Sequence, residues 1–186
     1  MVEFANIHGK RGPRKPKKLP VWIEPREYDE LIKYTRKDKH KLAFLLGYGA
    51  GMRVSEICKL EPRNVNLNDK TIKIEQGKGS KDRVVPLPSG FKSKYISLLP
   101  LNISPRALQK AFIVNIRRAH LIEKKPSLHF HSLRHGFATN AISNGIPLNH
   151  VQMLLGHTSA STTAIYLQSN PIDALKSYQE LFWKKH

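Results

Sequence analysis

A nearly continuous apolar run, residues 42–48, constrains the fold of this chain more than any other feature of its sequence. Even when the run is extended to Met52, it is far shorter than the roughly 20 residues that a helix needs to span a bilayer. A short apolar run of this kind is typical of a helix inside a protein core. The run therefore predicts a buried helix, followed by a looser turn at Gly49 and Gly51 that leads to Arg53.

The segments on either side of this run show helical spacing. Tyr28, Leu31 and Ile32 fall at positions i, i+3 and i+4, which starts an amphipathic face after Pro25. Ser104 followed by Pro105 is a typical helix start, because serine caps the first turn and proline fits the first helical position. Helices are predicted over residues 54–60, 105–118, 131–144, 147–155, 162–166 and 174–183.

Between the first and second helical regions, the pattern changes to that of a β-hairpin. Ile72 and Ile74 alternate with polar neighbours, and Val84 and Val85 follow a glycine-rich connection at residues 77–80. Asn66, Asn68 and Asp69 mark a turn before the hairpin. The predicted fold class is therefore mainly α with a small antiparallel β-sheet (α+β).

Charge indicates the kind of partner. The 186 residues suffice for one domain and contain 32 Lys and Arg against 14 Asp and Glu, a net charge of +18. Such an excess is the footprint of a protein that binds a polyanion, most often a nucleic acid. A single cysteine, Cys58, excludes an intrachain disulfide and a cysteine-based zinc site, and no apolar signal segment follows Met1. These observations predict an intracellular protein that binds DNA or RNA.

The first 20 residues differ from the rest of the chain. They contain six Lys and Arg residues against the single acidic Glu3, and Pro13, Pro16 and Pro20 prevent a helix. This segment is either a flexible tail or a basic strap that lies along phosphates, and a linker between two DNA-binding domains has the same composition.

Six polar side chains, unremarkable one by one, together make up the parts of a metal-free phosphoryl-transfer site. Arginine forks bind two phosphate oxygens each and stabilise the charge of a five-coordinate transition state. A tyrosine hydroxyl, with an ordinary pKa near 10, attacks at neutral pH only when cations lower that pKa or a histidine takes the proton. A lysine can protonate the departing oxygen. The six candidates are Arg53, Lys78, His131, Arg134, His157 and Tyr166.

The sequence around these residues resembles the catalytic domain of the tyrosine recombinases, the family of phage integrases and Xer proteins. The matching blocks are GAGMRVSEICKL with Arg53, QGKGSKDRVVPL with Lys78, HSLRHGFATN with His131 and Arg134, and LLGHTSASTTAIY with His157 and Tyr166. All six positions are filled in order and in their usual local contexts. Glu56 stands where an acidic residue commonly supports the first arginine.

The resemblance implies a site-specific recombinase that cuts and rejoins DNA without metal, ATP or any other cofactor. Tyr166 is expected to form a 3′-phosphotyrosyl link and release a 5′-hydroxyl. The 5′-hydroxyl of a partner strand is then expected to reverse this step. Arg53, Arg134 and His157 are expected to hold the scissile phosphate. His131 is expected to manage the proton of the tyrosine, and Lys78 to act as general acid.

The resemblance also implies partners and a domain organisation. Double-stranded DNA, a homotetramer on DNA, accessory directionality factors and a cytoplasmic, nucleoid-associated location are expected, without a membrane.

Residues 1–20 resemble the linker that follows the family's N-terminal core-binding domain, and residues 21–186 form the catalytic domain. The core-binding domain is absent, either because the sequence is a piece of a longer protein or because the protein is a single-domain recombinase. Residues 170–183 either dock on a neighbouring protomer or fold back on their own domain.

Several alternatives stay open. His129, His131 and His135 lie close in sequence and suggest a metal site, although Ser132 replaces the acidic residue of an HExxH motif. A recombinase-derived DNA-binding protein without strand exchange and a type IB topoisomerase-like activity are the alternative functions. Lys81 and Arg83 are alternatives to Lys78 for the phosphate contact of the hairpin.

Overall fold

The apolar run forms part of α2 (Asp38–Gly49), and the other helices of the first half pack around it. In the computed structural model, which describes residues 20–75, 82–156 and 171–183, α2 contacts α1 (Pro25–Tyr34), α3 (Val54–Lys59), α4 (Pro105–Arg118) and α6 (His131–Ser143). Leu42, Ala43 and Phe44 are fully buried although consecutive residues point about 100° apart round a helix. The prediction of a buried helix is confirmed.

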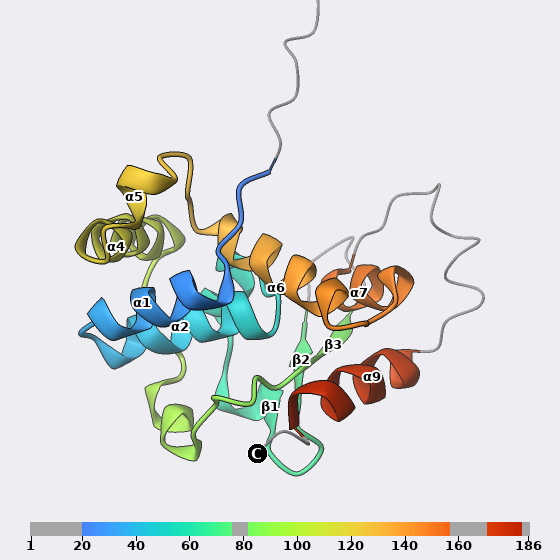
Figure 1. Cartoon of the computed structure of the whole chain (residues 1–186). Coiled ribbons are helices and arrows are strands. Elements are labelled where there is room, and N and C mark those ends of the chain that lie inside the picture. The colour runs from blue at the N-terminus through green and yellow to red at the C-terminus, as the bar shows by residue number, and fades with distance from the viewer. Residues whose placement is uncertain (1–19, 76–81, 157–170, 184–186) are drawn as a thin grey trace, which may run out of the picture.

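Three further helices complete the described part of the chain. They are α5 (Leu121–Lys124), α7 (Leu148–Leu155) and α9 (Pro171–Trp183), and short 3-10 turns lie at Pro62–Asn64 and Ser93–Leu98. Figure 1 shows α1, α2, α4 and α5 on one side of the molecule, α7 and α9 on the other, and α6 running between them. Within the described ranges, no helix has the length and apolar character that crossing a membrane requires.

Helix α4 begins where the sequence predicts. The Ser104 side chain accepts a hydrogen bond of 3.2 Å from the backbone N–H of Ala107, and Pro105 occupies the first position of the helix. One face of α4 then buries Leu108, Phe112 and Ile116, which follow at four-residue intervals. The predicted helix over 105–118 is confirmed, whereas the four-residue α5 that follows it was not predicted.

The sheet consists of three short antiparallel strands, β1 (Val65–Asn66), β2 (Thr71–Ile74) and β3 (Arg83–Pro86), in the order β1-β2-β3. Ile72 pairs with Val85 and Ile74 with Arg83, so these four side chains share the inward face. The predicted β2–β3 hairpin is confirmed, and its glycine-rich connection lies outside the described residues. The two-residue strand β1 is too short to show an alternation and was not predicted.

Two apolar clusters make up the core. The larger one centres on three aromatic rings, Phe44, Phe112 and Phe130, whose centroids lie 5.5 to 6.1 Å apart in edge-to-face arrangements. The smaller one joins α6, α7 and α9 through Phe137, Leu155 and Tyr178. Because α6 contributes Leu133 to the first cluster and Phe137 to the second, it connects the two halves of the domain.

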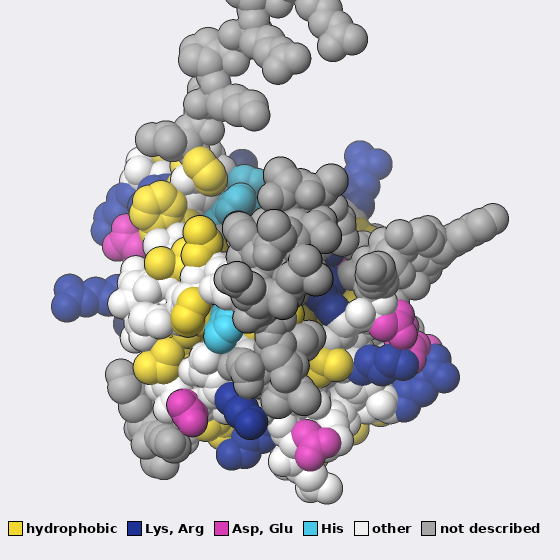
Figure 2. All heavy atoms as spheres, turned by 90° about the vertical axis from the view of Figure 1, so that its right-hand side faces the viewer, with side chains coloured by type: hydrophobic (Ala, Val, Ile, Leu, Met, Phe, Trp, Pro, Cys, Tyr) yellow, Lys and Arg dark blue, Asp and Glu magenta, His cyan; other side chains and the backbone are white. Residues whose placement is uncertain are grey.

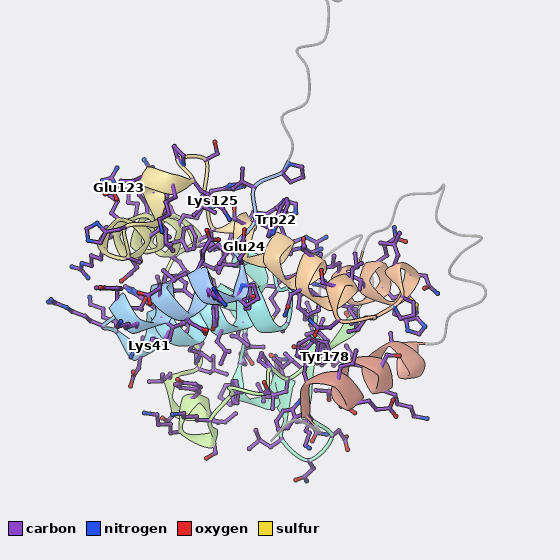
Figure 3. The ribbon with its side chains drawn as sticks, viewed as in Figure 1. Trp22, Glu24, Lys41, Glu123, Lys125 and Tyr178 are labelled. Atoms are coloured by element: carbon purple, nitrogen blue, oxygen red, sulfur yellow. The ribbon has the colours of Figure 1, made fainter. Side chains whose placement is uncertain are left out.

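In this structure α9 docks on its own chain. Ala174 and Tyr178 are buried against α7, and the Tyr178 hydroxyl donates a hydrogen bond of 2.6 Å to the carbonyl oxygen of Gly49. At the end of the helix, the Trp183 indole N–H donates to the carbonyl oxygen of Leu87 at 3.2 Å. Figure 3 shows Tyr178 directed from α9 into the interior of the molecule. This packing corresponds to the placement on the same domain, and docking on a neighbouring protomer stays a prediction.

An ion-pair cluster fixes the point at which the chain enters the domain. The Lys125 ammonium lies 2.9 Å from a Glu24 carboxylate oxygen and 2.8 Å from one of Glu27, and it also donates to the carbonyl oxygen of Trp22. Figure 3 shows Trp22, Glu24 and Lys125 side by side at this point. The first described residues are therefore tied to the segment that follows α5.

We predict that Phe112→Ala lowers the free energy of unfolding by about 3–5 kcal/mol, because the substitution removes a fully buried ring from the aromatic cluster. Val114→Ala is the matched control on the same helix, since Val114 is 45% exposed and its change should stay within about 0.5 kcal/mol. Urea denaturation measures both. Equal effects of the two substitutions would contradict the placement of the core.

Candidate active site

The structure describes three of the six predicted catalytic residues, namely Arg53, His131 and Arg134, and brings them to one region. Arg53 precedes α3, while His131 and Arg134 lie on the first turn of α6. Lys78, His157 and Tyr166 lie outside the described residues, as does the helix predicted over 162–166. The described part of the site therefore consists of the arginines, their partners and the histidines beside them.

Arg53 is held by Glu56 at the start of α3. The backbone N–H of Arg53 donates to one carboxylate oxygen at 2.7 Å, and its guanidinium donates to the other at 2.8 Å. The chain reaches Arg53 through Gly51, whose φ of +64° is a conformation that side-chain-bearing residues rarely adopt. A Cβ atom at Gly51 would also lie 2.7 Å from the ring of Phe137. Glu56 thus supports Arg53 as the resemblance implied.

A second arginine, Arg83, also binds Glu56. Its two terminal nitrogens donate to the two carboxylate oxygens at 2.8 Å each, and its Nε donates to the carbonyl oxygen of Leu154 at 3.1 Å. The side chain is only 9% exposed. These contacts argue against Arg83 as the phosphate contact of the hairpin, which was one of the alternatives. This role of Arg83 was not predicted from the sequence, although Arg83 lies two residues before the buried Val85 on the same strand and so shares its inward face.

The carboxyl of Glu56 remains ionised between the two arginines. Burial acts to raise its pKa, but hydrogen bonds from the Arg83 side chain and from Arg53 outweigh burial and lower the pKa below its ordinary value. Glu56 is therefore an anion in the folded protein at neutral pH, and its negative charge offsets part of the positive charge of the site.

Arg134 is buried, and its hydrogen-bond partners among the described residues are all backbone carbonyl groups. It is 4% exposed, and its two terminal nitrogens donate to the carbonyl oxygens of Gly51 at 2.6 Å and Leu155 at 2.5 Å. Burial, followed by the charges of Arg53 and Arg83, lowers its pKa to about 9. The guanidinium stays charged at neutral pH, in a position where an anionic ligand would relieve the repulsion.

The three arginines meet at the carboxyl end of α7. Three successive carbonyl groups there each face one guanidinium: Leu154 faces Arg83, Leu155 faces Arg134, and Gly156 lies 3.5 Å from Arg53. Carbonyls at a helix end lack partners within the helix and carry the negative end of its dipole. Gly156 closes the helix with a φ of +64°, and a Cβ atom there would lie 2.9 Å from the Arg83 side chain.

Three histidines lie beside the arginines at the start of α6. The ring of His131 is 4.8 Å from that of His135 and 6.3 Å from that of His129. Partial burial, then the nearby His135 and Arg134, lower the pKa of His131 to about 4, so the imidazole is neutral at pH 7. A neutral imidazole can accept a proton, as a general base must. Figure 2, which views the molecule from the side of α7 and α9, shows histidine side chains at the surface.

The histidines were also considered as metal ligands. In the part of the chain that the structure describes, no three His, Cys, Asp or Glu side chains are arranged so that they could hold a metal ion. The cluster of His129, His131 and His135 is thus not assembled as a metal site in this structure.

Comparison with known proteins explains this combination of residues. Residues 21–172 match the model of the phage integrase family, which is most of the chain. The chain belongs to the phage integrase family. A tyrosine recombinase of Thermosipho africanus is 34% identical over 185 residues, which cover 89% of this chain and 64% of that protein. The chain therefore spans less than two thirds of the length of this family member.

Solved structures of integrase family members share the fold. The crystal structure of a XerA recombinase matches with a TM-score of 0.63 and 25% identity, covering 91% of this chain and 66% of that one. A XerH site-specific recombinase, bound to its difH substrate in a pre-cleavage complex, matches with a TM-score of 0.61 and 25% identity over 84% of this chain and 53% of that one. The predicted fold class and family are both confirmed.

We predict that stability falls as the pH is lowered from about 6.5 to about 4, partly because of His131. Its pKa is lowered from an ordinary value of 6.5 to about 4 in the folded protein, so in this range the unfolded chain binds a proton that the folded protein does not. His131→Asn should therefore lose less stability than wild type between pH 7 and pH 5, measured by urea denaturation. An equal loss of stability in wild type and His131→Asn would contradict the lowered pKa of His131. So would a His131 ring signal that titrates near 6.5 in NMR.

Proposed function

We propose that this chain is the catalytic domain of a site-specific DNA recombinase that cuts and rejoins strands through a 3′-phosphotyrosyl intermediate. The observation that carries the proposal is the convergence of Arg53, Arg134 and Arg83 at the end of α7, where Glu56 is the one carboxylate bonded to them among the described residues. Such a cluster suits a phosphate whose negative charge increases in the transition state. Family membership supplies the reaction class.

In the proposed cleavage step, the Tyr166 hydroxyl oxygen attacks the scissile phosphorus, and the bond from phosphorus to the 5′ oxygen breaks. His131 accepts the tyrosine proton, which the neutral state of its ring permits. Lys78 donates a proton to the departing 5′ oxygen, and a 5′-hydroxyl is released. The rejoining step reverses these transfers with the 5′-hydroxyl of another strand, so the phosphodiester energy is conserved in the covalent link.

The arginines act on the phosphate in this proposal. Arg53 and Arg134 bind its non-bridging oxygens together with His157, which follows directly after Gly156 in the sequence. Because Arg134 is held by two carbonyls and Arg53 by Glu56, both guanidiniums are oriented before DNA arrives. Orientation of this kind removes the cost of reorganising the site during the reaction. Metal and cofactor chemistry are not needed for this sequence of steps.

The proposed partners are double-stranded DNA and further copies of the chain. The Tn1549 transposon integrase is in complex with a circular intermediate DNA, and a net charge of +18 suits a phosphate backbone. We propose that residues 1–20 form a basic linker and residues 21–186 the catalytic domain, acting as a tetramer at the nucleoid. Directionality factors would then select between integration and excision.

A covalent-trap assay tests the proposed reaction. We predict that wild-type protein, mixed with supercoiled host DNA in EDTA and stopped with SDS, forms a protease-sensitive protein–DNA adduct. Tyr166→Phe should form none, because the phenyl ring lacks the attacking oxygen. The matched comparison is DNA binding by the two proteins, which should be equal.

Two results would contradict the proposed function. An adduct that persists in Tyr166→Phe would assign another nucleophile. No wild-type adduct on DNA that the protein binds, even when an N-terminal core-binding domain is supplied, would indicate a DNA-binding relative without strand exchange.

A further inference from the structure

The Glu56 carboxylate is shared by two arginines that differ in their access to a ligand. Its side chain is 9% exposed, as is that of Arg83, whereas the Arg53 side chain is 37% exposed. Arg83 binds the carboxylate through two parallel hydrogen bonds of 2.8 Å, and the Arg53 guanidinium through one. Arg83 is therefore the inner partner of Glu56, and Arg53 is the arginine that faces solvent.

Removal of Arg83 would change what Glu56 does to Arg53. A carboxylate that is largely excluded from water needs a cationic partner. With Arg83 present, the paired hydrogen bonds satisfy this need, and the charge of Arg53 is left in surplus. Without Arg83, Arg53 is the one remaining cation bonded to Glu56 in the described structure, so the carboxylate competes with any incoming phosphate.

Arg83 also connects segments that are far apart in the sequence. It begins β3, five residues after Lys78, and its Nε donates to the carbonyl oxygen of Leu154 at the end of α7. Its aliphatic chain packs against Gly156, where a Cβ atom would lie 2.9 Å from Arg83 Cδ. The same side chain thus holds α3, the base of the hairpin and the end of α7 in a fixed relation.

We propose that Arg83 is a positioning residue, which neutralises Glu56 and so leaves the guanidinium of Arg53 free to bind the scissile phosphate. This role rests on the proposed function, because it is the phosphate of that reaction that Arg53 would receive. Arg83 itself does not contact the phosphate in this proposal. Its influence passes through Glu56, and replacement of Glu56 should therefore suppress the effect of removing Arg83.

The first experiment needs no activity. Inorganic phosphate is titrated into protein labelled with ¹⁵N at arginine, and the side-chain N–H signal of Arg53 is followed by NMR. We expect Arg83→Gln to need at least several-fold more phosphate than wild type for the same shift. Arg83→Gln combined with Glu56→Gln should return toward the wild-type response, since the competing carboxylate is gone and the net charge is restored.

Arg63→Gln is the matched control for the loss of one arginine charge. Arg63 is 72% exposed and pairs with Glu61 at 2.7 Å and Glu75 at 3.8 Å rather than with Glu56. Its substitution should leave the phosphate response of Arg53 unchanged. An equal loss of phosphate binding in Arg63→Gln and Arg83→Gln would show that only the net charge of the protein matters, and it would overturn the proposal.

The second experiment measures the rate of adduct formation for the same proteins. We expect Arg83→Gln to react at least roughly tenfold more slowly than wild type, which is the scale for losing a hydrogen bond to a charged group. The double variant should react faster than Arg83→Gln, and Arg63→Gln should match wild type. If Arg83 contacted the phosphate directly, the double variant would be no faster than Arg83→Gln, and the proposal would be wrong.

Two further points separate the possible failures. If Arg83→Gln does not fold, as judged by circular dichroism, the double variant still tests the proposal, because it buries no unpaired charge and should retain phosphate binding. If wild type forms no adduct but the phosphate titrations behave as expected, the proposed function fails and the role of Arg83 stands. If wild type forms the adduct and Arg83→Gln equals it in both experiments, the role of Arg83 is overturned.

Discussion

Three guanidinium groups of like charge are gathered at one helix end, and the carbonyl groups of α7 make this possible. Arg83, Arg134 and Arg53 approach the carbonyl oxygens of Leu154, Leu155 and Gly156, respectively. The negative end of the helix dipole and the carboxylate of Glu56 offset part of their mutual repulsion. Burial, followed by the remaining repulsion from Arg53 and Arg83, lowers the pKa of Arg134. A phosphate dianion or diester would offset that repulsion.

The smaller apolar cluster packs against this end of α7, because it includes Leu155. Phe137 stacks on Tyr178 at a centroid distance of 5.7 Å and leaves no room for a side chain at Gly51. Tyr178 in turn donates to the carbonyl oxygen of Gly49, so α9 is bonded to the loop that leads to Arg53. The position of the C-terminal helix and the orientation of Arg53 therefore depend on the same few contacts.

Much of the fold could be predicted because the signals are local, and the same kind of signal pointed to the candidate site residues. The apolar run of α2, the Ser104–Pro105 start of α4 and the alternation of Ile72 and Ile74 each depend on neighbours within a few residues. The motifs likewise located Arg53 and Arg134, which the structure brings together. The catalytic roles of all six candidates stay predictions, and Lys78, His157 and Tyr166 also lie outside the described residues.

What the sequence did not reveal depends on contacts between distant residues. Glu56 and Arg83 are 27 positions apart, and nothing in either segment indicates that the start of β3 bonds to α3. The docking of α9 on its own chain depends on a hydrogen bond from Tyr178 to Gly49, 129 positions away. The elements β1 and α5, of two and four residues, are too short to contain a period.

The central claim is that the arginines at the end of α7 form a phosphate site, and crystals soaked in tungstate test it most directly. The anion resembles phosphate in shape and charge, and its anomalous scattering locates it without ambiguity. The account predicts a tungstate ion within hydrogen-bonding distance of the guanidiniums of both Arg53 and Arg134, with Arg83 still on Glu56. Tungstate bound elsewhere on the basic surface and absent from these two arginines would contradict it.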